Sequence, residues 1–462
     1  MPKSTKTNLF IALLAVFLVK EIFWVALIPP PQAPDEYAHL SYIETWAHEG
    51  RLPKLGETLI YKRIEESSQG LSLAKTANKY EPGEQLNWIA QHPPLYYFLL
   101  KQLYSSVENN EPDQVIFFLR FTSIFFGLLT LFFVYLMVET LKPKNEWLSL
   151  LVVGFIAFLP DFSFISAVLN NDNLVMCLSA DLLYLGAKII THYEKISRKF
   201  WVDGLYMSIV MGLLLITKAT SLPIVAATIP FEMFYFGFKK HLPMMDFLKL
   251  FLMQFITIFG IAGWWYIGNY MQFHQLLPDL VSLAQNNPQI LKVHPDLITL
   301  FPEVTGMKNL LSPYQFFVKQ NFFWKYFVNI WGVFGKDFVQ LSIVQIMAYA
   351  GLIFASIIGY IKTRKQQKIA TPINIFFAFI AVILFAAITF KLFQIAQGRG
   401  FLGAMHGRYF LPAMIPIGYW IISGIQRLVK NRQNYWLVAL LFLFFAVTEI
   451  ATIATVIIPS FY

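Results

Sequence analysis

The sequence has little charge and almost no cysteine. Charged residues make up 14% of its 462 positions, and Cys177 is its one cysteine. Soluble domains carry about 25% charged residues, so this composition excludes an ordinary soluble enzyme. The hydrophobic content of 57% also excludes a disordered chain. A single cysteine excludes an intrachain disulfide framework and a thiolate metal cluster.

The sequence also lacks the short motifs of several enzyme classes. It contains no Walker loop, dinucleotide fingerprint, nucleophile elbow or HExxH zinc pair. A hydrolytic ATP motor and a zinc protease therefore have no support. No internal repeat of the kind found in many transporters is visible either.

Long apolar runs recur along the whole chain, and about 20 such residues suffice to cross a membrane. They predict an all-α integral membrane protein with about eleven transmembrane helices. The expected spans are 8–29, 114–141, 146–166, 172–191, 201–217, 220–237, 243–268, 339–361, 371–394, 409–426 and 435–458. The first run follows Lys3 and Lys6 without a small-residue cleavage site, which favours a retained helix over a removed signal peptide.

The positive charge is concentrated in alternate short loops. Segments 1–7, 142–145, 192–200, 238–242, 362–370 and 427–434 hold sixteen Lys or Arg, among them Lys142, Arg198 and Arg432, against one acid, Glu194. Such loops face the cytoplasm in membrane proteins, so the N-terminus is expected there. The net charge of +9 is therefore mainly a topology signal, and it does not imply nucleic-acid binding.

Two long loops are expected on the opposite, outer side. Residues 30–113 contain twelve acids and seven Lys or Arg, and residues 269–338 form the second loop. The first carries amphipathic stretches, and the second contains the aromatic run "FFWKYFVNIWGVFG", which suits a helix in the membrane interface. We therefore expect residues 1–462 to form a single polytopic membrane domain with a structured outer cap.

Ionisable residues inside a membrane are costly, so each is a functional candidate. Most lie toward the expected outer ends of their helices, whereas Asp181 and Glu449 lie nearer mid-membrane and Glu232 near the cytoplasmic end. The alternative for each is a packing or snorkelling role. The group near the outer ends comprises Lys20, Glu21, Arg120, Asp172, Lys218, Lys391 and Arg408.

The segment "PPPQAPDEYAHLSYIETWAHEG" follows the first span directly. Pro34, Asp35 and Glu36 suit a helix start, because acids favour the positive end of a helix, and Gly50 suits its end. Asp35 and His39 lie one turn apart on the same face. Asp35 could act as a general base toward an acceptor hydroxyl, or it could simply cap the helix.

Three further segments contain candidate residues, each with a simpler alternative. In "QHPPLYYFLL", Tyr96 and Tyr97 head an apolar segment too short to span, and they could be interface anchors. In "SAVLNNDNLVM", Asp172 could cap the fourth span or act as a second carboxylate or cation ligand. In "HGRYFLPAMIP", Arg408 suits a phosphate at headgroup depth, although it could instead be a snorkelling anchor.

Taken together, these features resemble the GT-C superfamily of membrane glycosyltransferases, and most closely a bacterial multispanning family of unknown function in that clan. The resemblance covers nearly the whole chain and depends on the order of six motifs. They are "PDEYAH", "HPPLYY", "NND", "GWWYIGNY", "FVNIWGVFG" and "GRYFLP".

The resemblance implies an acidic pair in the first outer loop as the functional centre and a polyprenyl-phosphate sugar as donor. Asp35 would be the catalytic base and Glu36 its helper or alternative. Arg408 and Lys218 would hold the donor phosphate. The substrate site would further be lined by His39, His92, Tyr96 and Asp172.

The chain departs from this family at one position, since Gly268 stands where an arginine is common. That cation is then either missing or supplied elsewhere, and Arg399 or Lys391 could supply it. The expected activity is an inverting transfer of one sugar to an envelope glycan, lipid or protein on the outer face of the cytoplasmic membrane. No cofactor is required by the sequence, although Asp35, His39 and Asp172 could gather a divalent cation.

Two other classes of function remain open on the sequence. A transporter or flippase for a lipid-linked or anionic substrate would use the intramembrane charges as a pathway. Such a protein is expected to distribute these charges across the membrane and to break helices near the midplane. A non-catalytic scaffold for envelope assembly would instead use the acidic loop to bind a partner.

Overall fold

The computed structural model describes residues 2–70, 79–141, 145–193, 196–239, 243–305, 311–335, 339–364, 371–403, 405–429 and 435–462. Lys142, Glu194 and Arg432, on which part of the expected topology depends, lie outside the described residues.

Helices long and apolar enough to cross a membrane dominate the structure. Eight occur among the described residues, and a ninth span results if the bent pair α6 and α7, which turns by 65°, crosses as one. The eight are α1 (Lys3–Leu27), α5 (Pro112–Thr140), α8 (Asp172–His192), α17 (Ile343–Thr363), α18 (Pro372–Arg399) and three composite helices at Ala219–Gly237, Met244–Phe273 and Tyr435–Phe461. The bent pair is α6 (Leu148–Ala157) and α7 (Pro160–Ser166).

The composite helices contain local changes of helical winding. The first composite helix comprises η3 (Ala219–Ser221), α10 (Leu222–Phe234) and η4 (Tyr235–Lys239). The second comprises α11 (Met244–Ile258), η5 (Phe259–Gly263) and α12 (Trp264–Phe273). The third comprises α20 (Tyr435–Thr452), η9 (Ile453–Ile457) and α21 (Ile458–Phe461).

The expected number of eleven spans is not confirmed. Each predicted segment does contain a helix or the bent pair, but two of these helices do not qualify as spans. α9 (Arg198–Leu215) begins with two basic residues and contains Asp203, and α19 (Leu411–Gln426) has 16 residues. A helix of 16 residues is about 24 Å long, shorter than the hydrocarbon core of about 30 Å.

The first long loop folds into short helices and a two-stranded sheet. It contains η1 (Pro30–Gln32), α2 (Glu36–Glu49), β1 (Leu59–Tyr61), α3 (Lys62–Ser68), β2 (Pro82–Leu86), η2 (Trp88–Gln91) and α4 (Leu95–Tyr104). β1 pairs antiparallel with β2, with Leu59 opposite Leu86. The predicted helix after the first span is confirmed as α2, and it ends at Gly50 in the left-handed conformation that glycine tolerates best.

The second long loop is also structured. It contains α13 (Leu280–Asn286), α14 (Gln289–Val293), α15 (Asp296–Leu300), η6 (Pro302–Thr305), η7 (Gln315–Lys319), α16 (Phe322–Asn329), β3 (Val333–Phe334) and β4 (Val339–Gln340). Outside this loop, a short helix η8 (Gly407–Phe410) directly precedes α19. The aromatic run forms a helix only as far as Asn329. Val333 and Phe334 beyond it pair with β4 instead.

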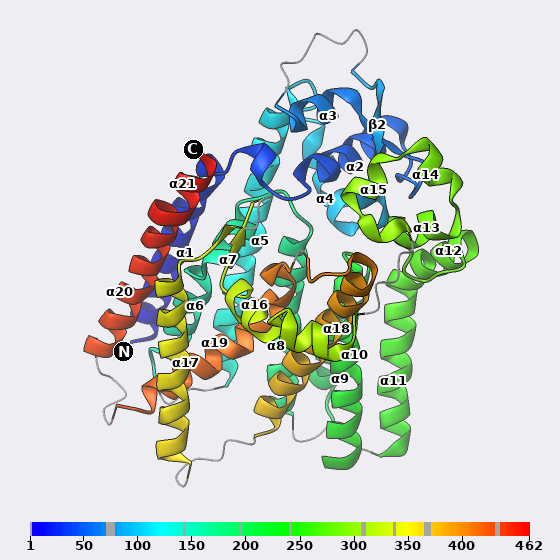
Figure 1. Cartoon of the computed structure of the whole chain (residues 1–462). Coiled ribbons are helices and arrows are strands. Elements are labelled where there is room, and N and C mark those ends of the chain that lie inside the picture. Colours follow the sequence, from blue (N-terminus) through cyan, green and yellow to red (C-terminus); the bar gives the residue numbers. More distant parts are fainter. Residues whose placement is uncertain are drawn as a thin grey trace.

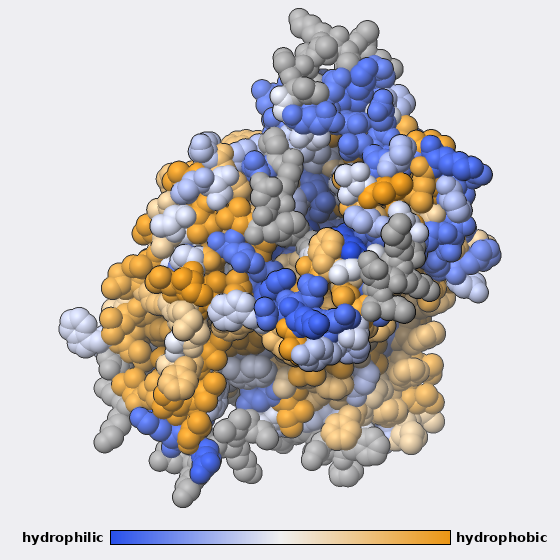
Figure 2. Space-filling view, viewed as in Figure 1, coloured by the Kyte–Doolittle hydropathy of each residue, from blue (hydrophilic) through white to orange (hydrophobic). Residues whose placement is uncertain are grey.

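The two parts of the molecule differ in surface character. Figure 1 shows α2, α3, β2, α14 and α15 grouped at one end of the long helices. In Figure 2 hydrophilic side chains cover this end, whereas apolar side chains cover most of the helical body. Large apolar side chains there, such as Phe354 and Leu440, are exposed. An apolar surface of this extent is expected where a protein faces lipid.

The packing of α2 against α4 and α5 positions the start of α2. Leu40 and Ile43 of α2 are fully buried in a cluster that includes Tyr97 and Leu100 of α4 and Leu119 of α5. Burying each large apolar side chain stabilises the fold by about 1.5–3 kcal/mol. The first loop is thus held on the end of α5.

Candidate active site

Asp35 stands at the N-terminal cap of α2 in a strained backbone conformation. Its φ of 65° places it in the left-handed region, which is unfavourable for residues other than glycine. Its carbonyl accepts the first helical hydrogen bond, from the His39 amide at 2.9 Å. Its side chain makes no capping hydrogen bond. The carboxylate is therefore free to point away from the helix end.

The Asp35 carboxylate is held by one donor on each oxygen. Trp88 Nε1 donates to Oδ1 at 3.2 Å, and Arg408 Nη2 donates to Oδ2 at 3.2 Å. The side chain is 32% exposed, whereas that of Arg408 is 5% exposed. The structure thus presents an oriented and partly accessible carboxylate, as a general base requires.

Arg408 joins Asp35 to a second carboxylate and a second cation. Its Nε lies 3.3 Å from Asp172 Oδ2, and Lys218 Nζ donates to Asp172 Oδ1 at 2.6 Å. Lys218 and Arg408 both lie over the ring of Tyr409, 5.4 Å from its centroid. We call Asp35, Asp172, Lys218 and Arg408 the Arg408 cluster. The structure brings together these four residues, which the sequence had marked on four separate segments.

The Arg408 cluster has a hydrogen-bond donor to spare. Among the described residues, the buried Nη1 of Arg408 has no hydrogen-bond partner. Arg408 Nε and Asp172 Oδ2 have none either, but these two atoms face each other as an ion pair at 3.3 Å. An unsatisfied buried donor costs about 1–3 kcal/mol, and more when it is charged. Arg408 also borders a narrow gap between Pro34, Asp161 and His406. A phosphate oxygen would satisfy this donor, because a guanidinium binds phosphate with well-aligned hydrogen bonds.

Two buried histidines line the same region. His39 Nδ1 lies 2.9 Å from the Tyr97 hydroxyl, and the His39 and His92 rings are nearly parallel with centroids 6.5 Å apart. Burial and the neighbouring Lys218 cation lower the pKa of both side chains well below 6.5, and Arg408 adds to the effect. Both imidazoles are therefore neutral at pH 7, so each offers one donor and one acceptor nitrogen.

Glu36 lies next to Asp35 in the sequence but faces another environment. Its carboxylate pairs with Arg120 through two hydrogen bonds of 2.8 and 2.6 Å, and neither side chain is exposed. Leu169 N also donates to Glu36. Arg120 Nη1 also donates to the carbonyls of Val25 and Ile28 at the end of α1. Glu36 thus connects α2 to α1, α5 and the segment before α8.

Three other sequence candidates have partners outside the Arg408 cluster. Arg399 forms two hydrogen bonds with Glu303 of η6, at 2.7 and 3.0 Å, and Lys391 lies 3.2 Å from Asp279. Both pairs connect α18 to the second long loop. Tyr96 is fully buried, with its ring edge-on to that of Tyr97. A side chain at Gly268 would meet open space.

Several residues of the site were not singled out from the sequence. Trp88 gave no local signal, because its role depends on where η2 places its indole N–H. His406 stands in a quoted motif and was not given a role, and Tyr97 was considered only as an aromatic anchor beside Tyr96. Asp161 could have been found as an acid between two apolar runs, since such residues are rare in membranes. Its buried Oδ2 has no hydrogen-bond partner among the described residues.

A divalent cation was expected to be possible at Asp35, His39 and Asp172. Across the described ranges, no group of three or more His, Cys, Asp or Glu side chains is arranged to hold a metal. Both carboxylates instead contact Arg408, and Asp172 also contacts Lys218. This arrangement does not fit a metal, so we derive no catalytic step from one.

The fold is similar to those of two membrane glycosyltransferases of the GT-C superfamily. ArnT from Cupriavidus metallidurans bound to undecaprenyl phosphate is 12% identical, with a TM-score of 0.50 over 95% of this chain and 63% of ArnT. The Archaeoglobus fulgidus oligosaccharyltransferase in complex with Zn and sulfate is 12% identical, with a TM-score of 0.54 over 95% of this chain and 53% of that enzyme. A structure of the latter, AglB, with an inhibitory peptide and a dolichol-phosphate has a TM-score of 0.52 at 13% identity, over 95% of this chain and 55% of AglB.

These similarities confirm the predicted GT-C fold and the all-α integral membrane class. The chain spans between half and two thirds of the length of the structures that it matches. No family model matches the sequence, and no curated protein does. The narrower resemblance to one multispanning family therefore stays a prediction.

Proposed function

We propose that this membrane protein transfers one sugar from a polyprenyl-phosphate donor to a hydroxyl group of an acceptor. The observation that carries the proposal is the pairing of Asp35, a partly exposed carboxylate, with Arg408, a buried guanidinium that has a spare donor. The carboxylate suits an attacking hydroxyl and the guanidinium suits a departing phosphate. The structural neighbours bound to undecaprenyl phosphate and dolichol-phosphate support this class of donor.

In the proposed mechanism Asp35 accepts the proton of the acceptor hydroxyl as its oxygen attacks the anomeric carbon. The new glycosidic bond forms while the bond between that carbon and the phosphate oxygen breaks. The electron pair leaves with the lipid phosphate, and a single displacement inverts the anomeric configuration. Arg408 Nη1 and Lys218 stabilise the negative charge that develops on the phosphate, which is a large contribution in a buried site.

The other residues around Asp35 have positioning roles in this mechanism. Trp88 and Arg408 orient the carboxylate, and the Glu36–Arg120 pair holds the start of α2 on α5. His39 and His92 provide neutral hydrogen-bonding groups for the sugar or the acceptor. Asp172 keeps Lys218 and Arg408 close together, since it contacts both.

The proposal places the site on the outer face of the cytoplasmic membrane and the N-terminus in the cytoplasm. The expected acceptor is an envelope glycan, lipid or protein. Reporter fusions after residue 4 and within residues 52–58 of the first loop should report opposite sides of the membrane. The same side for both would contradict the proposed orientation.

The decisive experiment replaces Asp35 by Asn in a deletion strain. Mass analysis of envelope glycans, lipids and proteins should show one missing sugar in the deletion strain and its return with the wild-type protein. Asp35→Asn keeps the shape of the side chain but removes the base, so the sugar should stay missing although the variant is produced at the normal level. Normal transfer by this variant would remove Asp35 from its role.

Glu57→Gln is the matched control. Glu57 belongs to the same loop, and its side chain is 62% exposed in a surface pair with Lys54. This variant should transfer normally, because such surface pairs contribute little. An unchanged envelope in the deletion strain would instead favour the transporter or scaffold alternatives. Repeating the assay on isolated membranes with a chelator tests whether transfer depends on a divalent cation.

A further inference from the structure

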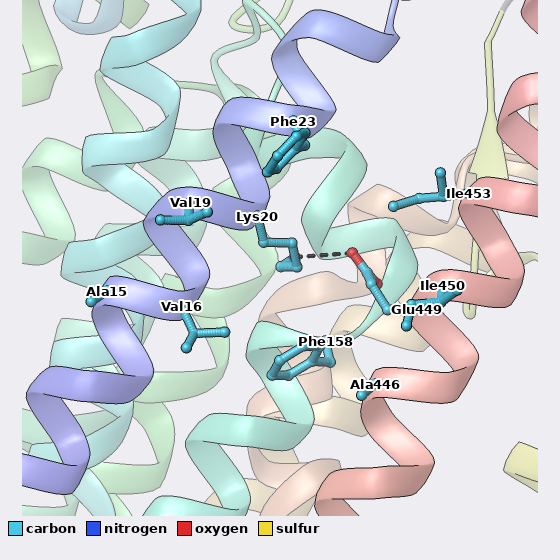
Figure 3. A pocket seen from close by; sticks show the side chains of 10 residues that line it. All are labelled: Ala15, Val16, Val19, Lys20, Phe23, Phe158, Ala446, Glu449, Ile450 and Ile453. Atoms are coloured by element: carbon cyan, nitrogen blue, oxygen red, sulfur yellow. Dashed lines mark hydrogen bonds and ion pairs between the residues drawn. The ribbon is translucent and has the colours of Figure 1, made fainter.

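A second cluster of buried charges lies at a cavity between α1, the α6–α7 bend and the last composite helix. The cavity has a volume of about 520 Å³, within the range typical of small-molecule sites. Figure 3 shows that α1 and α20 contribute opposite walls, with Phe158 between them. Apart from Lys20 and Glu449, its lining is apolar: Ala15, Val16, Val19, Phe23, Phe158, Ala446, Ile450 and Ile453.

The cavity opens toward the lipid-facing surface. Val19 and Phe23 of α1 are 55% and 63% exposed, and Ile450 of α20 is 65% exposed. The polar groups lie at its inner side, where Lys20 and Glu449 are largely buried. An elongated apolar molecule could therefore enter sideways from the bilayer and place a polar end group against these two residues.

The hydrogen bonds of Lys20 exclude an anionic end group there. An ammonium has three donors. Those of Lys20 are directed at Glu21 Oε1 at 2.5 Å, Ser163 Oγ at 2.5 Å and Glu449 Oε1 at 3.1 Å. No donor remains for a phosphate, and two carboxylates lie beside this one cation. We call Lys20, Glu21 and Glu449 the Lys20 cluster.

The atoms of this cluster that have no hydrogen-bond partner among the described residues are two acceptors, Glu21 Oε2 and Glu449 Oε2, and of these two residues Glu449 lines the cavity. Glu449 Oε1 receives hydrogen bonds from Lys20 and from Trp24 Nε1, the latter at 2.6 Å. The buried Oε2 of Glu449 has no hydrogen-bond partner within the part of the chain that the structure describes. Leaving a buried carboxylate oxygen unpaired inside a membrane is costly, so a ligand that donates to it would gain binding energy.

We propose that this cavity binds a lipid with a single apolar chain that ends in a hydroxyl group. A hydroxyl can donate a hydrogen bond to Glu449 Oε2, which a methyl ether cannot do. It is also cheaper to bring into hydrocarbon than a charged amine. This site is separate from the proposed phosphate site and does not depend on the proposed transfer.

Photolabelling of the purified full-length protein in phosphatidylcholine nanodiscs tests the proposal. Three probes carry the same diazirine-bearing alkyl chain and end in a hydroxyl, a methyl ether or a phosphate. The alcohol should label peptides of α1 and α20 about tenfold more than the ether, which cannot donate, because a hydrogen bond to a charged group is worth this factor. Equal labelling by alcohol and ether, or stronger labelling by the phosphate, would overturn the proposal.

Two tryptophan variants locate the site. Ala446→Trp fills the cavity from α20 and should abolish labelling by the alcohol. Val447→Trp is the matched control, because Val447 is the next residue, is 54% exposed and does not line the cavity. Equal labelling of the two variants would show that the alcohol binds elsewhere.

A third variant tests the chemistry of recognition. Glu449→Leu removes the acceptor and leaves Lys20 balanced by Glu21, so alcohol and ether should label it equally. A persistent preference for the alcohol would contradict the role of Glu449. Elution as a single species in size-exclusion chromatography shows that each variant is folded. If Glu449→Leu does not fold, the comparison of Ala446→Trp with Val447→Trp still tests whether the alcohol binds in this cavity.

Discussion

The Arg408 cluster and the Lys20 cluster are built from the same kinds of side chain but have opposite hydrogen-bond balances. Arg408 and Lys218 face two carboxylates, and Arg408 keeps a donor without a partner among the described residues. In the Lys20 cluster one cation, Lys20, faces two carboxylates. Glu449 there keeps an acceptor oxygen that has no hydrogen-bond partner among the described residues.

This difference shows why a count of buried charges does not identify a ligand. Both clusters hold Lys or Arg against two carboxylates, so residue types alone would suggest similar sites. The unused atom determines the chemistry, because a buried polar atom gains most from the partner that it lacks. The Arg408 cluster suits an anion, and the Lys20 cluster suits a hydrogen-bond donor.

Arg408→Gln should have the largest effect on the proposed transfer. The amide cannot replace the charge or reach Asp35 and Asp172 together, so we expect the rate to fall about 100- to 1,000-fold, as for loss of a charge-stabilising donor elsewhere. Initial rates of sugar transfer in isolated membranes measure the change. Arg51→Gln, a change of an exposed arginine paired with Glu49, is the control. A rate for Arg408→Gln close to that of the control would contradict the role of the spare donor.

The Glu36–Arg120 pair serves as a comparison, because its two buried side chains are held by hydrogen bonds to each other and to neighbouring backbone groups. Glu36→Gln or Arg120→Met should lower the free energy of unfolding by about 3–5 kcal/mol, since each leaves an uncompensated buried charge. Thermal unfolding of the detergent-solubilised protein measures this loss. Lys54→Gln in an exposed pair should change stability by less than about 1 kcal/mol.

The same experiment tests the prediction that Glu36 is a catalytic helper. Loss of transfer by Glu36→Gln without a loss of stability would support that prediction over the positioning role.

Trp88→Phe should have a smaller effect on transfer. It removes the hydrogen bond to Asp35 Oδ1 and keeps an aromatic ring against Phe301. We expect the rate to fall about tenfold, the value of one hydrogen bond to a charged group. Trp46→Phe, a change of a half-buried tryptophan on α2, is the control. A Trp88→Phe protein with the rate of wild type would show that Arg408 alone orients Asp35.

The neutral histidines beside the Arg408 cluster should make stability depend modestly on pH. Because the folded-state pKa of His39 and His92 lies well below 6.5, the unfolded state binds more protons below that pH. Stability should therefore be complete above pH 6.5 and fall on acidification, by at most about 1.4 kcal/mol per pH unit for each histidine.

Unfolding temperatures between pH 7.5 and 4.5 measure this dependence. His92→Gln should flatten it, whereas a change of the exposed His48 to Gln should not. An equal dependence in both variants would assign the pH effect to other groups.

The membrane class and the helix after the first span could be predicted from the sequence because both depend on local patterns. Runs of apolar residues identify spans, and the Pro-Asp-Glu start with a glycine stop identifies α2. The span count could not be predicted as well. Composition alone does not show that α19 has 16 residues or that α6 and α7 meet at 65°.

The candidate site was predicted in part for a related reason. Asp172, Lys218 and Arg408 were marked as ionisable residues near span ends, and Asp35 was marked as an acid at the expected start of a helix after the first span. Both rules are local. Residues of this cluster that contact one another are separated by up to 373 positions in the sequence. The partners of Arg399 and Glu36 likewise depend on which helices pack together, so the sequence could not separate them from the cluster.

The sequence by itself determined that the chain lies in a membrane, because the cost of burying charge in hydrocarbon acts on every segment independently. It also determined which few ionisable residues the membrane part retains. Only the tertiary structure decided how these residues pair, and hence which atoms stay unpaired. The unused donor of Arg408 and the unused acceptor of Glu449 exist because distant helices fix the directions of their neighbours' hydrogen bonds.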